Sequence, residues 1–237
     1  MKRFFSVFIF SAVLAYSGYS QSKAYFTSGG EMIFSLAKIE YEGGSESSIL
    51  RWAPFFNAQS MVNLDLNKNI GIFSGLAIRN VGFIYGKYKV YDAARSANVE
   101  AYTTYKKKFR TYNLAIPVGI KIGNLEKMFV YGGYEVEFPF HYKEKTFNSE
   151  NDKTKKTEWF SDRVEKIQHG FLVGIQFPYG MNLKFKYYLS NFHNQDFRDS
   201  DGNMPYDDLK ANVFYFSLSS SLFKNMDFDS PVPDKKL

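Results

Sequence analysis

The sequence contains no cysteine, which excludes disulfide bonds, thiolate metal sites and a cysteine nucleophile. After residue 15 it also lacks any apolar run of the roughly 20 residues that a membrane-spanning helix needs, so a helical membrane protein is excluded. Histidine is scarce: His141, His169 and His193 lie far apart, without the spacing of metal ligands. We therefore predict no catalytic, metal or cofactor site. Lipid hydrolysis by a serine, a histidine and an acid is the enzymatic alternative.

The N-terminus has the three-part pattern of a cleavable secretory signal. Lys2 and Arg3 precede an apolar run over residues 4–15, and small residues lead up to Gln21. The run is too short for a membrane anchor, so we predict a signal peptide over residues 1–20. Losing those two cations lowers the formal net charge from +6 to +4. Because acids and bases are mixed through the remaining chain, nucleic acid is not a predicted partner.

The composition combines 19% aromatic residues with a mean hydropathy of only −0.33. A transmembrane barrel has such a composition, because residues that face lipid alternate with residues that face the lumen.

Eight segments alternate with a period of two, as β-strands do. In the clearest of them, Ile116, Val118 and Ile120 lie on one face, while small or charged residues occupy the other. Pro117 interrupts the ladder of this segment, and we expect a β-bulge there. Each segment is about long enough to cross a bilayer when tilted. The eight segments cover residues 29–39, 55–66, 70–79, 114–123, 130–138, 170–177, 182–190 and 209–223.

The connections between these segments alternate in length. Short connections are expected at 67–69, 123–127 and 178–180, and long polar ones at 40–48, 86–105, 143–162 and 191–208. Outer-membrane barrels have short periplasmic turns and long external loops. The sequence thus predicts an eight-stranded antiparallel up-and-down transmembrane β-barrel over residues 21–223, in the outer membrane of a Gram-negative bacterium. A disordered periplasmic tail is expected over 224–237.

Charged residues share the face opposite the apolar one. If the apolar face meets lipid, these charges converge on a lumen that eight strands leave just wide enough for side chains to fill. We predict a salt-bridged polar network there, with a conducting pore as the alternative. Its members are Arg79, Lys121, Glu135, Glu137, Lys184 and Lys186.

Aromatic residues near the strand ends are expected to form two girdles at the membrane interfaces. These residues are Trp52, Phe55, Phe56, Tyr85, Tyr105, Tyr112, Phe138, Phe140, Tyr142, Phe177, Tyr179, Phe192 and Phe223. The basic stretch Lys106, Lys107, Lys108 and Arg110 is compatible with contact to anionic lipid headgroups and equally with an ordinary solvated strand end.

Several phrases resemble the small outer-membrane β-barrel family of the Bacteroidetes called PorT-like, with an OmpX-type architecture. They are Gly29-Gly30-Glu31, residues 114–123, residues 184–191, and a last strand that closes on Leu222 and Phe223. The resemblance implies insertion by the outer-membrane assembly machinery, which recognises a terminal strand ending in an aromatic residue. It implies no common catalytic residues, and some members serve in protein secretion.

The expected role is that of a non-enzymatic structural, adhesion or secretion-accessory component. Its partners would be outer-membrane lipid, the assembly machinery and a protein bound through the external loops. Two alternatives stay open: a barrel enzyme acting on outer-membrane lipids, and a soluble lipocalin-like carrier with an apolar interior.

Overall fold

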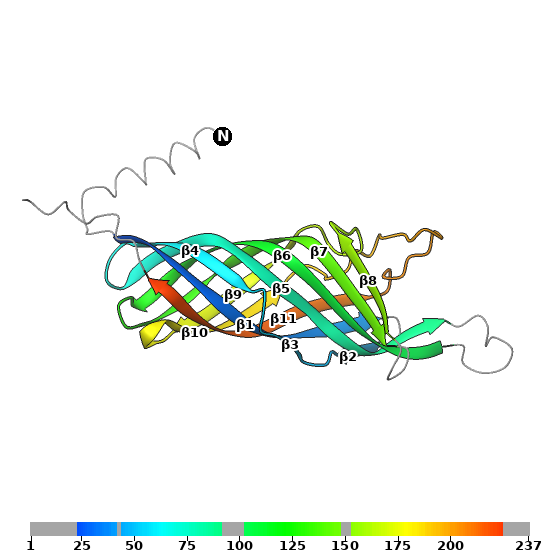
Figure 1. Ribbon diagram of the computed structural model, residues 1–237. Coiled ribbons are helices and arrows are strands. Elements are labelled where there is room, and N and C mark those ends of the chain that lie inside the picture. Colours follow the sequence, from blue (N-terminus) through cyan, green and yellow to red (C-terminus); the bar gives the residue numbers. More distant parts are fainter. Residues whose placement is uncertain (1–22, 42–43, 92–101, 148–152, 225–237) are drawn as a thin grey trace, which may run out of the picture.

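The computed structural model describes residues 23–41, 44–91, 102–147 and 153–224 (Figure 1). The predicted signal peptide and all but the first residue of the predicted tail lie outside these ranges. The elements are β1 (Lys23–Tyr41), β2 (Gly44–Ser47), β3 (Arg51–Ala53), β4 (Ala58–Asp65), β5 (Ile70–Tyr91), β6 (Tyr102–Asn124), β7 (Met128–Phe147), β8 (Lys153–Trp159), β9 (Gln168–Gln176), the short 3-10 helix η3 (Pro178–Gly180), β10 (Met181–Tyr188) and β11 (Lys210–Lys224). No helix in these ranges has the length and apolar character needed to cross a membrane.

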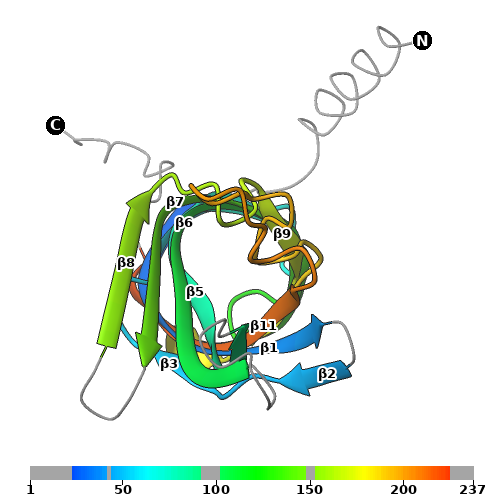
Figure 2. The same cartoon turned by 90° about the vertical axis from the view of Figure 1, so that its right-hand side faces the viewer.

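Eight of these strands form a closed ring in the order β1, β4, β5, β6, β7, β9, β10, β11. The ring closes because β1 also pairs with β11, and every pairing is antiparallel. The short strands β2 and β3 pair with β1, and β8 extends the sheet beside β7. Figure 2 looks into this ring. The predicted eight-stranded antiparallel up-and-down β-barrel is confirmed.

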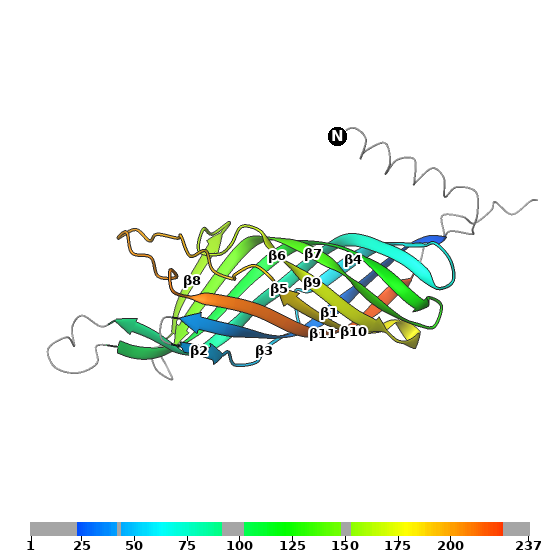
Figure 3. The same cartoon turned by 180° about the vertical axis from the view of Figure 1, so that it is seen from behind.

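Short and long connections lie at opposite ends of the barrel, called here the turn end and the loop end. At the turn end, the side chain of Asn67 accepts hydrogen bonds from the backbone N–H groups of Asn69 and Ile70, at 2.8 and 2.9 Å. The start of β1 pairs with the end of β11, so both lie at the turn end (Figures 1 and 3).

Three strands extend much further towards the loop end than predicted. β5, β6 and β7 contain 22, 23 and 20 residues, and β7 continues into a hairpin with β8. Much of 86–105 and 143–162, expected as loops, is therefore strand. The alternation inverts in this region: in β6, Phe109 points inward, whereas Lys108 and Arg110 point outward. The sequence prediction ended these strands too early because it assumed apolar side chains on the outer face throughout, whereas in this region they lie on the inner face.

Pro117 lies in β6 without the predicted bulge. It pairs in register with Glu135, and the β5–β6 ladder keeps the same register on both sides of it. Its missing N–H group therefore removes a ladder bond without shifting the strand, while its carbonyl accepts a 2.9 Å hydrogen bond from the hydroxyl of Ser74. The bulge between β6 and β7 falls at Tyr112/Asn113 instead.

The outer surface of the turn-end half is an apolar belt. Outward side chains on all eight ring strands contribute exposed aliphatic or aromatic groups, such as Leu76 (56% exposed) and Val118 (56%). We define the belt by Phe26, Met32, Val62, Ile70, Ile72, Leu76, Ile78, Leu114, Ile116, Val118, Ile120, Ile122, Val130, Phe138, Phe171, Val173, Leu183, Tyr187, Leu189, Phe216 and Leu218.

Beyond the belt, towards the loop end, the interior holds the main apolar cluster of the described chain. Val81, Phe83 and Phe109 are fully buried there. Three residues expected in the aromatic girdles, Tyr85, Tyr142 and Phe192, also point inward, so the girdle prediction is wrong for them. Their strands or loops belong to this inverted half, where the inside is the apolar side. By contrast Trp52, Phe55, Phe56, Phe138, Phe177 and Tyr179 are exposed, and Tyr112 and Phe140 are half-buried. The side chains of Tyr105 and Phe223 lie outside the described part of the structure.

Candidate functional site

The six charged residues singled out in the sequence all point into the barrel and are almost completely buried. They come from four ring strands: Arg79 from β5, Lys121 from β6, Glu135 and Glu137 from β7, and Lys184 and Lys186 from β10. Within each strand the two-residue period places them on the inward face, opposite the belt.

Small residues make room for the two β7 carboxylates. Across the ladders, Glu135 lies between Pro117 and Gly170, and Glu137 lies opposite Ala115. A side chain at Gly170 would place its Cβ 2.1 Å from the carbonyl oxygen of Tyr187, so only glycine fits this position. The carboxylates therefore extend into the lumen.

Five of the six residues meet in one network at mid-height of the barrel, together with Glu31 of β1. Arg79 forms an ion pair with Glu31 and another, at 3.0 Å, with Glu135. Lys186 contacts Glu135 at 2.6 Å and Glu137 at 2.5 Å. Lys184 reaches Glu31 at 2.8 Å. Three acids thus face three bases, and the central network is electrically neutral.

Neutral hydrogen-bonding groups complete the network on the loop side. The carboxylate of Glu137 accepts hydrogen bonds from the Asn113 amide at 2.6 Å and from the Tyr188 hydroxyl at 2.7 Å. The same amide donates to Gln168 at 3.0 Å. These bonds satisfy lone pairs of a carboxylate that is fully buried, a condition for an enclosed ion to be tolerated.

Lys121 belongs to a second cluster, nearer the turn end. Its ammonium group lies 2.5 Å from the carboxylate of Asp65, 3.0 Å from the hydroxyl of Tyr25 and 3.2 Å from the side-chain oxygen of Asn63. The structure therefore separates Lys121 from the other five residues.

Glu31 is the main residue that sequence reasoning missed. The signal was present, because Glu31 shares its strand face with Ser35. That face also carries Ile33, Ala37 and Ile39, which are buried in the loop-end half. Because this face mixes polar and apolar residues, a prediction based on a uniformly polar inner face does not identify Glu31.

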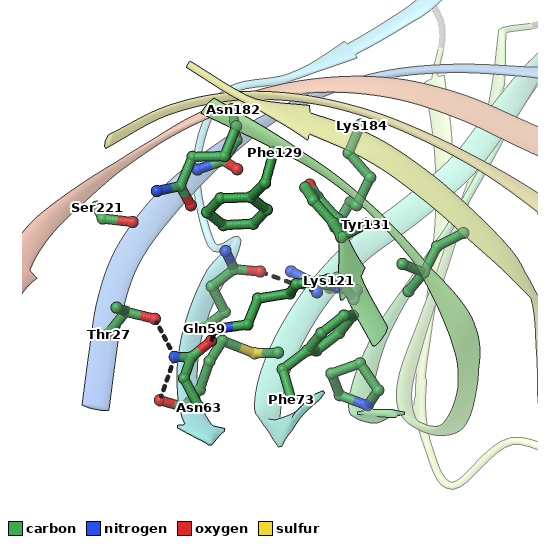
Figure 4. Close-up of a pocket in the computed structure, with 15 residues that line it drawn as sticks. Thr27, Gln59, Asn63, Phe73, Lys121, Phe129, Tyr131, Asn182, Lys184 and Ser221 are labelled. Carbon is green, nitrogen blue, oxygen red and sulfur yellow. Dashed lines mark hydrogen bonds between the residues drawn. The ribbon is translucent and has the colours of Figure 1, made fainter. Parts of the chain in front are cut away.

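The turn-end half of the lumen is hollow. Two adjoining cavities of about 70 and 270 Å³ share Asn63, Phe129 and Gln176 in their linings. Figure 4 shows Lys121 extending into the smaller cavity, with Thr27 and Asn63 joined by a hydrogen bond beside it. The larger cavity is lined by residues of two turns, including Leu125 and Tyr179, and so lies at the turn end.

The loop-end half is filled, because the connection between β10 and β11 folds inward. His193 and Tyr206 stack with ring centres 4.2 Å apart, and His193 also meets Phe109 edge to face at 4.7 Å. Burial lowers the pKa of His193 to about 3, so its ring is neutral.

Burial alone would raise the pKa of the nearby Glu144, but its 2.8 Å ion pair with Lys107 outweighs this effect and holds the pKa below its ordinary value.

The histidines have no arrangement of a hydrolase in the described residues. His169 shares a 2.6 Å hydrogen bond with the hydroxyl of Tyr134, His141 packs edge to face on Trp159, and the ring of His193 meets the backbone carbonyl of Arg163 at 3.4 Å. None of these rings hydrogen-bonds a serine hydroxyl within the described ranges.

No protein-family model matches the chain, and no curated protein matches its sequence. Among solved structures it is similar to Ail, the attachment invasion locus protein of Yersinia pestis, crystallised with the heparin analogue sucrose octasulfate. The identity is 12% and the TM-score 0.36, over 85% of this chain and 99% of Ail. It is also similar to Neisserial surface protein A, with 10% identity and a TM-score of 0.36 over 86% of this chain and 100% of the other. These values are low, and the fold assignment rests on the strand pairing itself.

Proposed function

We propose that the chain is an exported integral outer-membrane β-barrel that crosses the bilayer with its apolar belt. It carries no current and no catalytic activity, and its loop end serves a structural, adhesion or secretion-accessory role. The predicted signal peptide over residues 1–20 would direct its export, and the PorT-like resemblance favours insertion by the outer-membrane assembly machinery.

The inversion of polarity along the barrel supports this proposal best. In the turn-end half, aliphatic side chains lie outside and ion pairs inside; in the loop-end half, the apolar cluster lies inside and lysines lie outside. Soluble proteins rarely expose a contiguous apolar patch larger than a few hundred Å². A barrel that stands partly in hydrocarbon and partly in water accounts for both halves.

The dimensions of the belt agree with a membrane. From Leu114 to Ile122, β6 rises about 26 Å along the strand, or about 20 Å along the barrel axis at a tilt of about 40°. Exposed aromatic residues flank it, among them Trp159 and Phe160 towards the loop end and Tyr179 at the turn end. With these flanking rings, the height of the apolar surface approaches that of the apolar band on outer-membrane barrels, which is about 25 Å.

The interior argues against the alternative functions. A lipocalin-like carrier needs an apolar cavity, whereas the cavities here are lined by Lys121, Lys184 and several amides. A conducting pore needs a continuous lumen, whereas Phe83, Phe109 and His193 fill the loop-end half.

Cell fractionation tests the membrane assignment. The chain should resist sarkosyl extraction, and its folded form should migrate differently from the boiled form in a gel. Recovery in the soluble periplasmic fraction would contradict the proposal. N-terminal sequencing of the recovered protein should begin at Gln21.

A deletion strain tests the absence of catalysis. Its outer-membrane lipids should give the same mass spectrum as the parent strain, whereas a lost or gained acyl chain would favour the lipid-enzyme alternative. Affinity capture from intact membranes, with loop-exchange variants as controls, would identify a protein partner of the loop end.

A further inference from the structure

Seven cations share one outward surface at the loop end, on three adjacent strands. We call it the basic face, and it consists of Lys106, Lys108 and Arg110 of β6, Lys143 and Lys145 of β7, and Lys153 and Lys155 of β8. The register places Lys108, Lys145 and Lys155 directly opposite one another in one row. Figure 2 shows the three strands side by side at the edge of the ring.

The basic face has no carboxylate partners in the described part of the chain. The acids of β7 and β8 lie on the other side of these strands, where Glu144 pairs with Lys107 and Glu158 with Arg163. Like charges directly opposite each other in a sheet are destabilising. Partial burial and the neighbouring cations lower the pKa of Lys108 and Lys145. An anion on this face would relieve the repulsion.

The position of the basic face relative to the belt indicates which kind of anion binds there. Arg110 lies four residues beyond Leu114, the last belt residue of β6, which is about 13 Å along the strand. The headgroup layer begins at the edge of the hydrocarbon and is about 5 to 8 Å thick in an ordinary leaflet. At a tilt of about 40° this is about 10 Å along the barrel axis, so Arg110 and Lys143 stand just outside the headgroup layer and the row of Lys108, Lys145 and Lys155 about 5 Å further out. Their long side chains can bend back towards the phosphate groups.

Exposed aromatic rings form the lower border of the basic face. Trp159, the last residue of β8, is 67% exposed and stacks on Phe140 at 6.2 Å; the next residue, Phe160, is 74% exposed. Aromatic side chains of this kind favour the membrane interface. A ligand bound here would therefore place apolar chains on the belt and negative charge on the lysines.

We propose that the basic face binds the phosphate groups of anionic lipids in the leaflet at the loop end. The proposal rests on the membrane assignment made above. A soluble sulfated or phosphorylated polymer would satisfy the charges equally well, but would leave unexplained why the face adjoins exposed rings and the belt.

Native mass spectrometry of the full chain in a neutral detergent tests this proposal, with diphosphoryl lipid A, its dephosphorylated form and a soluble sulfated polysaccharide as probes. The patch variant is Lys108→Gln/Lys145→Gln/Lys155→Gln. The matched control, Lys38→Gln/Lys166→Gln/Lys210→Gln, removes three exposed loop-end cations that have carboxylate partners. A third variant with arginine at the three patch positions keeps the charge.

The wild type, the control and the arginine variant should retain diphosphoryl lipid A, and none should retain the dephosphorylated form. The patch variant should bind about a hundredfold more weakly, from the contribution of each surface cation. Equal binding by patch variant and control would overturn the proposal, as would preference for a soluble sulfated polysaccharide over lipid A. Failure of the membrane assignment would show separately, as a wild type that stays folded and soluble without detergent.

Discussion

Replacing Lys186 by methionine should strongly destabilise the barrel. This side chain is fully buried, and its ammonium group forms ion pairs with the carboxylates of Glu135 at 2.6 Å and Glu137 at 2.5 Å. Methionine keeps most of the volume but leaves the three acids of the central network facing only Arg79 and Lys184. An uncompensated buried charge costs about 3–5 kcal/mol of unfolding free energy.

A double variant separates loss of charge balance from loss of packing. Lys186→Met/Glu137→Gln removes one charge of each sign, so the remaining network is neutral again. Asn113 and Tyr188 can still hydrogen-bond the glutamine at position 137. We expect the second change to restore about half of the lost stability, a coupling within the range known for residues in direct contact.

Urea unfolding of the barrel in lipid vesicles, followed by tryptophan fluorescence, measures both variants. The reasoning would be refuted if Lys186→Met lost less than about 1 kcal/mol, or if the double variant were less stable than the single one. Glu126→Gln, an exposed change at the turn end, is the control and should alter stability by less than about 0.5 kcal/mol.

Three further predictions concern the belt, the filled half and His193. Ile116→Arg, in the middle of the belt, should cost about 2–4 kcal/mol in vesicles, whereas Ser45→Arg, exposed on β2 and opposite Glu40, should cost less than about 0.5 kcal/mol; equal effects in urea unfolding would contradict the membrane span. The wild type should add no stepwise conductance to a planar bilayer, and porin-sized steps would show that the loop-end half is open. His193 is buried and neutral with a pKa of about 3, below its unfolded value of about 6.5, so the unfolded chain binds the extra proton and stability falls as the pH drops through that interval. The loss should reach about 1.6 kcal/mol between pH 6.5 and 5, and His193→Phe should abolish this part of the pH dependence in unfolding curves at the two pH values.

The sequence was sufficient to predict the ring of strands and the inward direction of the charges. Both depend only on the two-residue period within a strand, and residues such as Glu135 and Lys186 carry that signal locally. Their pairing could not be predicted, because it depends on the stagger between strands that closes the barrel. For the same reason the sequence did not place Lys121 at a different height from the other charges.

The loop-end half was misjudged for a different reason. Its strands follow the same period, but water rather than lipid would surround them, so the apolar and polar faces exchange roles. Phe109 and Tyr142 therefore belong to the interior, and the lysines beside them form the basic face. A search that allowed both polarities would have extended β5, β6 and β7 to their observed lengths.

Site-directed spin labelling tests the central claim most directly, because the chain has no native cysteine and each label is unique. Labels at Ile116 and Val173, in vesicles, should be relaxed by oxygen dissolved in the bilayer and shielded from a water-soluble nickel complex. Labels at Lys108 and Lys155 should show the reverse. If Ile116 and Val173 were accessible to the nickel complex and protected from oxygen, the apolar belt would not face lipid, and the membrane assignment would be wrong.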